Sequence, residues 1–204
     1  MGLIALGTAC RSTVYQAYEK FGVYKRDLLK KDVEAARDDQ QKAAEQFKDA
    51  LTRLKEMYGV QEGEMEKMYA KLKADYDRSA DRAGAVKSRV AKVEQVAADL
   101  FKEWEQEIAG MTNEKLASNS RAKLSDTKQK YQSLHAAMKK AEVSMDPVLA
   151  QFKDQVLYLK HNLNAQAIGS LKGETVDIEK EIGKLIRDMN ASISQADEFI
   201  KGLP

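Results

Sequence analysis

The sequence predicts an all-α fold, an elongated antiparallel four-helix bundle or coiled coil. Ala, Glu, Lys, Gln, Leu and Met, which lose little conformational freedom in a helix, fill much of the 204-residue chain. Proline, the strongest helix breaker, occurs twice, and one of the two is the last residue, Pro204. Apolar residues recur every seven positions over long stretches, which directs one narrow face of each helix toward its neighbours.

Three clusters of helix-breaking residues divide the chain into four segments. These clusters, which contain glycine, threonine or asparagine, are 58–63, 110–113 and 162–173. Gly59 and Gly110 occupy the place of a helix C-cap, and Thr112 or Asn113 can cap the following helix. The four helices are therefore expected near 13–57, 64–109, 114–166 and 174–201.

The first two helices are supported by two heptad rows each. In the first helix, the rows are Val33, Phe47 and Leu54, interrupted by Gln40, and Ala36, Ala43, Ala50 and Met57. In the second helix, they are Tyr69, Tyr76, Ala83, Val90, Ala97 and Trp104, and Met65, Leu72, Val86, Val93 and Leu100, with Ser79 in the gap. These residues are the predicted core of the first half of the chain.

The third helix contains the only internal proline, Pro147. One row runs through Ala117, Leu124, Tyr131, Met138, Met145, Phe152 and Leu159, and a second through Ser120, Thr127, Leu134, Ala141 and Val148. The first row keeps its phase across Pro147, although proline removes a backbone donor and clashes with the preceding turn. We therefore expect a kink at Pro147, or a restart with Asp146 as the cap, with the same face buried on both sides.

The fourth helix follows a change of phase. Its rows are Leu171, Ile178 and Leu185, and Ile168, Thr175, Ile182, Met189 and Ala196. These rows are displaced by about two residues from the positions reached by continuing the rows of the third helix. The heptad pattern is therefore not continuous from the third helix into the fourth. The displacement predicts a real turn within 162–173.

The charges are numerous and balanced. Charged residues make up 32% of the chain, but the net charge is only +2, which gives no basis for a nucleic-acid-binding surface. The net charge of the four segments alternates in sign, so antiparallel neighbours are complementary. We expect the charges to pair within the molecule and expect no nucleic-acid partner.

The residues needed for common catalytic sites are missing. One cysteine and two histidines exclude a disulfide scaffold and a zinc site of several thiolates. A ferritin-like site needs Glu three residues before His, but Gln132 and Tyr158 stand before His135 and His161. The sequence has no phosphate-binding loop, no Gly-x-Ser-x-Gly and no His-Glu-x-x-His. We expect no enzymatic activity, no cofactor and no metal.

The single cysteine, Cys10, ends a short apolar run. Leu-Gly-Thr-Ala-Cys at 6–10 resembles a bacterial lipobox, in which the cysteine is lipidated and the preceding leader is removed. Nine residues without Lys or Arg are shorter than an ordinary signal peptide of about 15–30 residues, and an upstream start codon would explain this. The alternative is an apolar terminus with a free thiol. The expected organisation is a leader at 1–9, a lipid-anchor linker at 10–12 and one helical domain at 13–204.

Lipidation would place one end of the molecule at a membrane. Thr13 and Gln16 have the spacing of a capping box, so only Arg11 and Ser12 would separate the anchor from the first helix. By analogy with enterobacterial sorting, arginine after the cysteine favours the outer membrane, with the protein facing the periplasm. The nearby tyrosines and basic residues would then lie at the headgroups or belong to ordinary amphipathic packing.

The polar string at 160–166 is the most unusual segment. Lys160, His161, Asn162, Asn164 and Gln166 are read in two ways. In the first interpretation, they form an interaction or hinge site near one end of the molecule, and Pro147 is a further candidate hinge within the third helix. Alternatively, Asn, His and Gln satisfy the free backbone groups of a helix terminus.

Several strings together resemble a known family. They are Tyr-Lys-Arg-Asp at 24–27, Val-Glu-Ala-Ala-Arg-Asp at 33–38, Leu-Phe-Lys-Glu-Trp at 100–104, Met-Asp-Pro-Val-Leu at 145–149, Asp-Gln-Val-Leu at 154–157 and the stretch 159–168. The chain resembles, over roughly 15–200, the uncharacterised Gram-negative bacterial family called domain of unknown function 2959. Members carry the labels lipoprotein or putative DNA-repair ATPase. The resemblance implies no catalytic residues, and the missing phosphate-binding loop argues against the ATPase label.

These observations favour a non-catalytic cell-envelope lipoprotein that acts as a helical scaffold or adaptor for protein partners. The first alternative is a peripheral protein that binds or shapes membranes with its length and basic patches. The second is a cytosolic coiled-coil factor associated with DNA repair, which requires an unmodified Cys10. Exposed apolar residues outside the rows, such as Val156 and Leu157, leave a homo-oligomer open.

Overall fold

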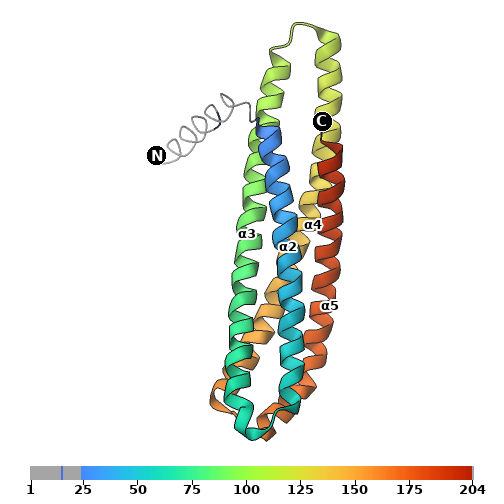
Figure 1. Cartoon of the computed structure of the whole chain (residues 1–204). Coiled ribbons are helices and arrows are strands. Elements are labelled where there is room, and N and C mark those ends of the chain that lie inside the picture. Colours follow the sequence, from blue (N-terminus) through green and yellow to red (C-terminus); the bar gives the residue numbers. More distant parts are fainter. Residues whose placement is uncertain (1–14, 16–23, 204) are drawn as a thin grey trace, which may run out of the picture.

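The computed structural model describes residue 15 and residues 24–203, and this part of the chain is all-α (Figure 1). The long helices are α2 (Lys25–Glu56), α3 (Met65–Ala109), α4 (Glu114–His161) and α5 (Ala165–Gly202). Two short 3-10 turns, η1 (Met57–Gly59) and η2 (Glu62–Glu64), join α2 to α3. The described residues contain no strand. The all-α prediction is therefore confirmed.

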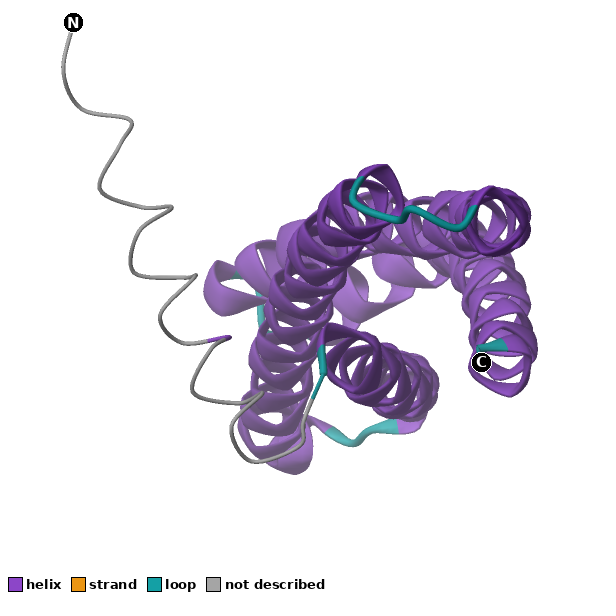
Figure 2. Cartoon of the chain, turned by 90° about the horizontal axis from the view of Figure 1, so that it is seen from above, coloured by secondary structure: helices purple, strands orange, loops and turns teal. Residues whose placement is uncertain are grey.

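The four long helices lie side by side (Figures 1 and 2). The helix α2 packs on α3 and α5, and α4 packs on the same two helices. Ion pairs show the relative directions of α2 and α3: Lys25 at the start of α2 meets Glu103 near the end of α3. Arg53 near the end of α2 meets Asp75 near the start of α3, with 3.4 Å between Nε and Oδ2. The two helices thus run in opposite directions.

The heptad rows form the core. Phe47 and Leu54 of α2, Val86 and Val90 of α3, and Met138, Met145, Leu185 and Met189 of the later helices are fully buried. The row residue Gln40 is buried with them, although it is polar. The aromatic row members Tyr69, Tyr76, Trp104 and Tyr131 are partly buried and pack against this core. The predicted seams are therefore the faces that the helices bury.

Ion pairs join each helix to its neighbours. Arg37 of α2 meets Asp197 of α5 at 2.8 Å, and Lys55 meets Glu179 at 2.7 Å. Between α3 and α4, Lys87 meets Asp146 at 2.7 Å, and between α4 and α5, Lys140 meets Asp188 at 2.8 Å. These contacts agree with the internal pairing that the alternating segment charges predict. The exposed pairs among them add little stability each, about 0.2–1 kcal/mol.

The turn predicted within 162–173 is much shorter than expected. The helix α4 ends at His161 and not near 166, and α5 begins at Ala165 and not near 174. Gly169 and Gly173, taken as turn residues, lie inside α5. The side chain of Asn164 accepts a hydrogen bond from the backbone N–H of Ala167, so a single capping asparagine starts the helix early. Once the helix is started, glycine lowers its stability without ending it.

The first helix also differs from its predicted bounds. It was expected from residue 13, and the described helix α2 starts at Lys25 after an N-cap at Tyr24. Cys10, the leader at 1–9, the linker at 10–12 and the expected capping box of Thr13 and Gln16 lie outside the described residues.

The helix α4 continues through Pro147 as one element. The expected restart with Asp146 as a cap therefore does not occur. Proline has no N–H to donate to the carbonyl of Val143, and Val143 is on the exposed side of α4, with 61% of its surface accessible. Solvent can satisfy a carbonyl in that position, and the row residues Met145 and Val148 on either side stay buried.

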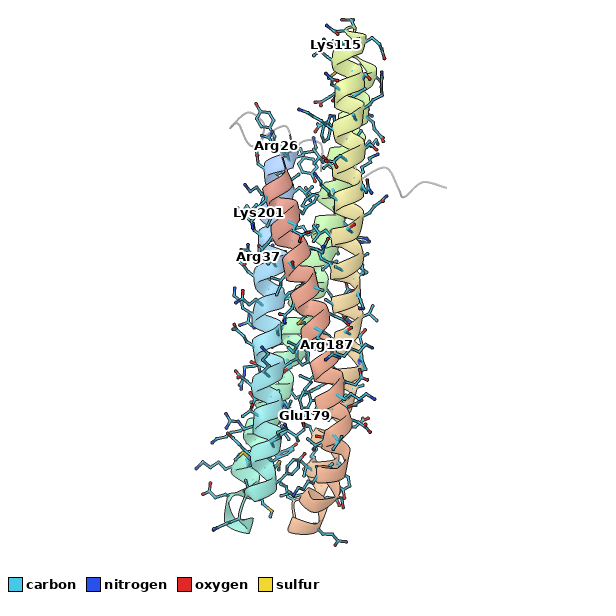
Figure 3. All side chains as sticks on the ribbon, turned by 90° about the vertical axis from the view of Figure 1, so that its right-hand side faces the viewer. Arg26, Arg37, Lys115, Glu179, Arg187 and Lys201 are labelled. Atoms are coloured by element: carbon cyan, nitrogen blue, oxygen red, sulfur yellow. The ribbon has the colours of Figure 1, made fainter. Side chains whose placement is uncertain are left out.

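The hairpin of α3 and α4 extends beyond the other two helices. Glu103 is the α3 residue that pairs with the first residue of α2, and six more residues of α3 follow it. In Figure 3, Lys115 of this hairpin lies beyond Arg26 at the start of α2 and Lys201 at the end of α5. We call this extension, residues 104–120, the arm. None of the described helices is long and apolar enough to cross a membrane.

Candidate functional site

The predicted polar string at 160–166 forms the turn between α4 and α5. The side-chain amide of Asn162 donates to the carbonyl of Tyr158 at 2.9 Å, and Asn164 caps α5. Lys160 and His161 are exposed in the last turn of α4, where positive charge suits the helix dipole. The carbonyl of Gln166 accepts from the hydroxyl of Ser170 at 3.1 Å. The described contacts of the asparagines are those of a helix terminus, which the second interpretation predicted.

Buried carboxylates are held by cations from neighbouring helices or from their own helix. Asp75 is met by Arg53 and Arg78, and Asp188 by Lys140, with a 2.6 Å bond from the hydroxyl of Ser144. Burial raises the pKa of Asp188, but Lys140 and Ser144 favour its charged form, and the pKa is lowered overall. These contacts leave the carboxylates in structural roles between helices.

His135 has a side-chain partner and lies beside an aromatic ring. Its Nε2 is 2.7 Å from Oε1 of Glu94, and its ring stacks on Tyr131 at 5.8 Å between centroids. Tyr131 also meets Phe101 and Phe199 edge to face. Among the described residues, no three His, Cys, Asp or Glu side chains are grouped as a metal site requires. His135 thus connects α4 to α3 through its contact with Glu94.

The arm begins at a pocket of about 330 Å³. The pocket is lined by residues from the start of α2, the end of α3 and the end of α5: Tyr24, Lys25, Arg26, Leu100, Glu103, Trp104, Glu107 and Leu203. Trp104 is fixed by a 2.8 Å hydrogen bond from its indole Nε1 to the hydroxyl of Ser120. An amphipathic ring beside charges of both signs is typical of protein contact surfaces.

A second pocket of about 480 Å³ lies between α3 and α4, lined by α3 residues of the arm and by α4 residues that directly follow the arm. Ile108 and Leu124 form part of its apolar wall, and Glu105 and Lys128 pair at its edge. At the tip, Met111 and Leu116 are 41% and 59% exposed. The arm therefore has pockets beside it, and the apolar side chains of Met111 and Leu116 at its tip are not covered by any described residue.

The family of the chain follows from its sequence as a whole. The model of the family described as "Protein of unknown function (DUF2959)" matches residues 14–203. The chain belongs to this family. The match covers every described helix, so the family resemblance read from the short strings is confirmed. No curated protein matches the chain.

Pro147 and the polar residues of the string at 160–166, which the sequence indicated as candidates, do not line these pockets. Pro147 lies in the last third of α4, where the neighbouring Asp146 pairs with Lys87, and the string at 160–166 forms the turn. The arm was missed because the first and second helices were expected to have nearly equal lengths. The arm can be recognised from the residues of α3 that follow Glu103. This requires knowing where α2 starts, because Lys25 at that point pairs with Glu103.

Proposed function

We propose that this chain is a non-catalytic lipoprotein of the cell envelope that serves as a helical scaffold or adaptor for protein partners. The observation that carries the proposal is the arm, which extends a two-helix surface beyond α2 and α5 (Figure 3). It ends in the exposed side chains of Met111 and Leu116, next to pockets with apolar walls. Exposed apolar side chains beside polar rims are what a protein partner buries.

The architecture that belongs to this proposal is an elongated antiparallel four-helix bundle. The packing of each helix on two others and the ion pairs between them support it. We place a kink of α4 at Pro147, where the missing backbone bond weakens the helix. A body of this kind holds the arm at a fixed distance from the opposite end.

The proposed location is the outer membrane, with the protein facing the periplasm and anchored by lipid on Cys10. The lipobox-like residues at 6–10 support the anchor. More than one acyl chain is needed for durable attachment, which lipidation of an amino-terminal cysteine supplies. The experiment is expression with and without Cys10→Ala. The wild type should gain the mass of lipid and sediment with membranes, and the variant should do neither; a soluble wild type with its leader intact contradicts the location.

One observation favours the alternative of a protein that binds or shapes membranes. Lys115 and Lys123 are exposed on the arm and near its base and form no ion pair within the described residues. Arg26, at the start of α2, lies toward this same end of the molecule (Figure 3), and Cys10 precedes α2 in the sequence. Salt-sensitive binding of the Cys10→Ala protein to anionic vesicles would support this function, because surface lysines add about 1 kcal/mol each near such lipids.

The scaffold function is tested at the tip of the arm. A photo-crosslinking amino acid replaces Leu116 in living cells, and in a second strain it replaces Val143, which is equally exposed, at 61% against 59%, but lies on α4 within the body. We expect a discrete protein adduct from position 116 alone, and its loss when Met111→Asp is added. Equal adducts from both positions would contradict a partner site on the arm.

A further inference from the structure

A third pocket lies between α4 and α5, away from the arm and near their connecting turn. Its volume is about 330 Å³. Seven of the described residues line it: Gln151, Asp154, Gln155, Tyr158, Leu171, Asp177 and Ile178. It is therefore formed by the last three turns of α4 and the first half of α5, at the lower end of the molecule in Figure 1.

Two glutamines of the pocket lining have side-chain oxygens without a hydrogen-bond partner among the described residues. Gln155 is 5% exposed, and its Oε1 accepts no hydrogen bond within the described part of the chain. The buried Oε1 of the half-buried Gln151 is in the same condition. An unpaired buried acceptor costs about 1–3 kcal/mol, so two of them in one pocket indicate a place where donors bind.

The charge of the pocket is negative and uncompensated. Asp154 of α4 and Asp177 of α5 are exposed residues of its lining, and neither forms an ion pair with the described residues. No lysine or arginine is among the lining residues that the structure describes. By contrast, Asp75 and Asp188, which lie at other helix contacts, each form an ion pair, with Arg78 and Lys140 respectively. Two unpaired carboxylates around unused acceptors attract a cationic donor.

The remaining walls of the pocket are apolar. Leu171 and Ile178 are 7% and 1% exposed and belong to the core of the molecule. Tyr158, 41% exposed, adds an aromatic ring, whose face attracts cations. A ligand that fits all the walls carries a positive donor group on a short apolar chain.

We propose that this pocket binds a primary alkylammonium group. The ammonium donates three hydrogen bonds, which match the oxygens of Gln151 and Gln155 and the carboxylates, and its methylenes pack on Leu171 and Ile178. The group belongs either to a free diamine or to a lysine side chain of a protein. The site is separate from the arm and does not depend on the scaffold function.

A bare metal ion fits the same residues less well. The volume of about 330 Å³ is far larger than an ion needs, and the described residues contain no group of three His, Cys, Asp or Glu placed to hold a metal. Divalent cations also prefer several oxygen ligands in close geometry, whereas three of the seven described lining residues are apolar or aromatic.

The probe is 1,5-diaminopentane, titrated into the full 204-residue chain by calorimetry. Nα-acetyl-lysine methylamide tests the lysine source, 1,5-pentanediol is the neutral control, and Ca²⁺ tests the metal. We expect saturable binding of the diamine, or of both amines, with shifts of the Gln155 side-chain amide signal in NMR spectra. The two amines distinguish a free diamine from a lysine side chain.

Variants assign the binding to the pocket. Gln155→Leu removes the buried acceptor and should weaken binding about tenfold or more, since hydrogen bonds to charged groups are the strong ones. Asp154→Asn and Asp177→Asn should each weaken it about two- to fivefold, as expected for exposed charges. Asp49→Asn is the matched control on α2, exposed and without an ion pair among the described residues, and should leave the affinity unchanged.

Several outcomes would overturn the proposal. They are the absence of amine binding at millimolar concentration, equal binding of the diol, and displacement of the diamine by stoichiometric Ca²⁺. Unchanged affinity in Gln155→Leu, with helix content by circular dichroism equal to the wild type, would do so as well. Because Leu fills the same volume as Gln without a polar atom, this variant is expected to fold.

Discussion

Gln40 is a polar residue at a seam position of α2. Its row otherwise carries Val33, Phe47 and Leu54, and its side chain is fully buried, with neither the amide nitrogen nor the oxygen bonded to a described residue. Ser192 of α5 is equally buried, and its hydroxyl is likewise unbonded. Polar seam residues of this kind lower stability while they select register and partners.

Replacement of Gln40 by leucine is expected to stabilise the protein. The change removes two unpaired polar atoms at nearly constant volume, so the free energy of unfolding should rise by about 1–3 kcal/mol. Gln41→Leu at the exposed neighbour is the control and should change it by less than about 0.5 kcal/mol. Chemical unfolding measures both, and a destabilised Gln40→Leu would show that the amide has a partner in solution.

Tyr58 makes the stability depend on alkaline pH. Burial raises its pKa from 10.0 to about 12, and its hydroxyl has no partner in the described structure. The folded state therefore favours the neutral ring: stability is complete below pH 10 and falls as the pH rises toward 12. At pH 11, Tyr58→Phe should lose about 1 kcal/mol less than the wild type, whereas the control Tyr24→Phe should behave as the wild type. Unfolding at pH 8 and pH 11 measures the difference, and equal losses in all three proteins would contradict it.

At the scale of the elements, the sequence predicts which face of a helix is buried better than it predicts where the helix ends. The heptad rows predict the core residues because the seven-residue period is repeated many times. One polar residue in a row, such as Gln40, does not obscure that period. A helix end depends on a single local choice. Asn164 caps α5, so the helix begins before the exposed Gly169 and Gly173. These glycines lower the stability of the helix too little to move its start to a later residue.

The same reasoning explains what was missed at the pocket between α4 and α5. The second row of α4 was followed only to Val148, and one further heptad leads to Gln155, a buried glutamine at a seam position. The row therefore carried a signal for this residue. The sequence carried no such signal for Asp177, because its place in the same pocket lining as Asp154 depends on the register of two helices, which the sequence does not state.

The glycines of α5 test where the last helix begins. Gly169 and Gly173 are exposed inside α5, and a Cβ at either position would meet no atom within 4 Å. Ala at each should raise the free energy of unfolding by about 0.5–1 kcal/mol, because glycine loses more freedom on entering a helix. Gly110→Ala, at the end of α3, is the control with little expected gain. A loss of stability at 169 and 173 would restore the longer turn that the sequence predicted.

At the scale of the whole molecule, length and direction decide what the protein can reach. The helix α4 has 48 residues, which corresponds to about 70 Å at 1.5 Å per residue. The arm and the pocket between α4 and α5 lie toward opposite ends of this span (Figure 1). One molecule can therefore present two separate surfaces at a fixed spacing, which is what an adaptor requires.

The order and direction of the helices can be tested with a carbodiimide, which joins an amine directly to a carboxylate. Four pairs connect the four neighbouring interfaces: Lys25–Glu103, Lys87–Asp146, Lys140–Asp188 and Lys55–Glu179. We expect all four amide links in peptide mass spectra of the monomer band, because each pair lies in contact and the proposed antiparallel bundle would bring all four together in one molecule. Lys55→Arg should remove only the link to Glu179, since a guanidinium does not react in this way. Links whose yield rises with protein concentration would instead place Lys55 and Glu179 on two copies of the chain, and a missing Lys140–Asp188 link would contradict the packing of α5 on α4.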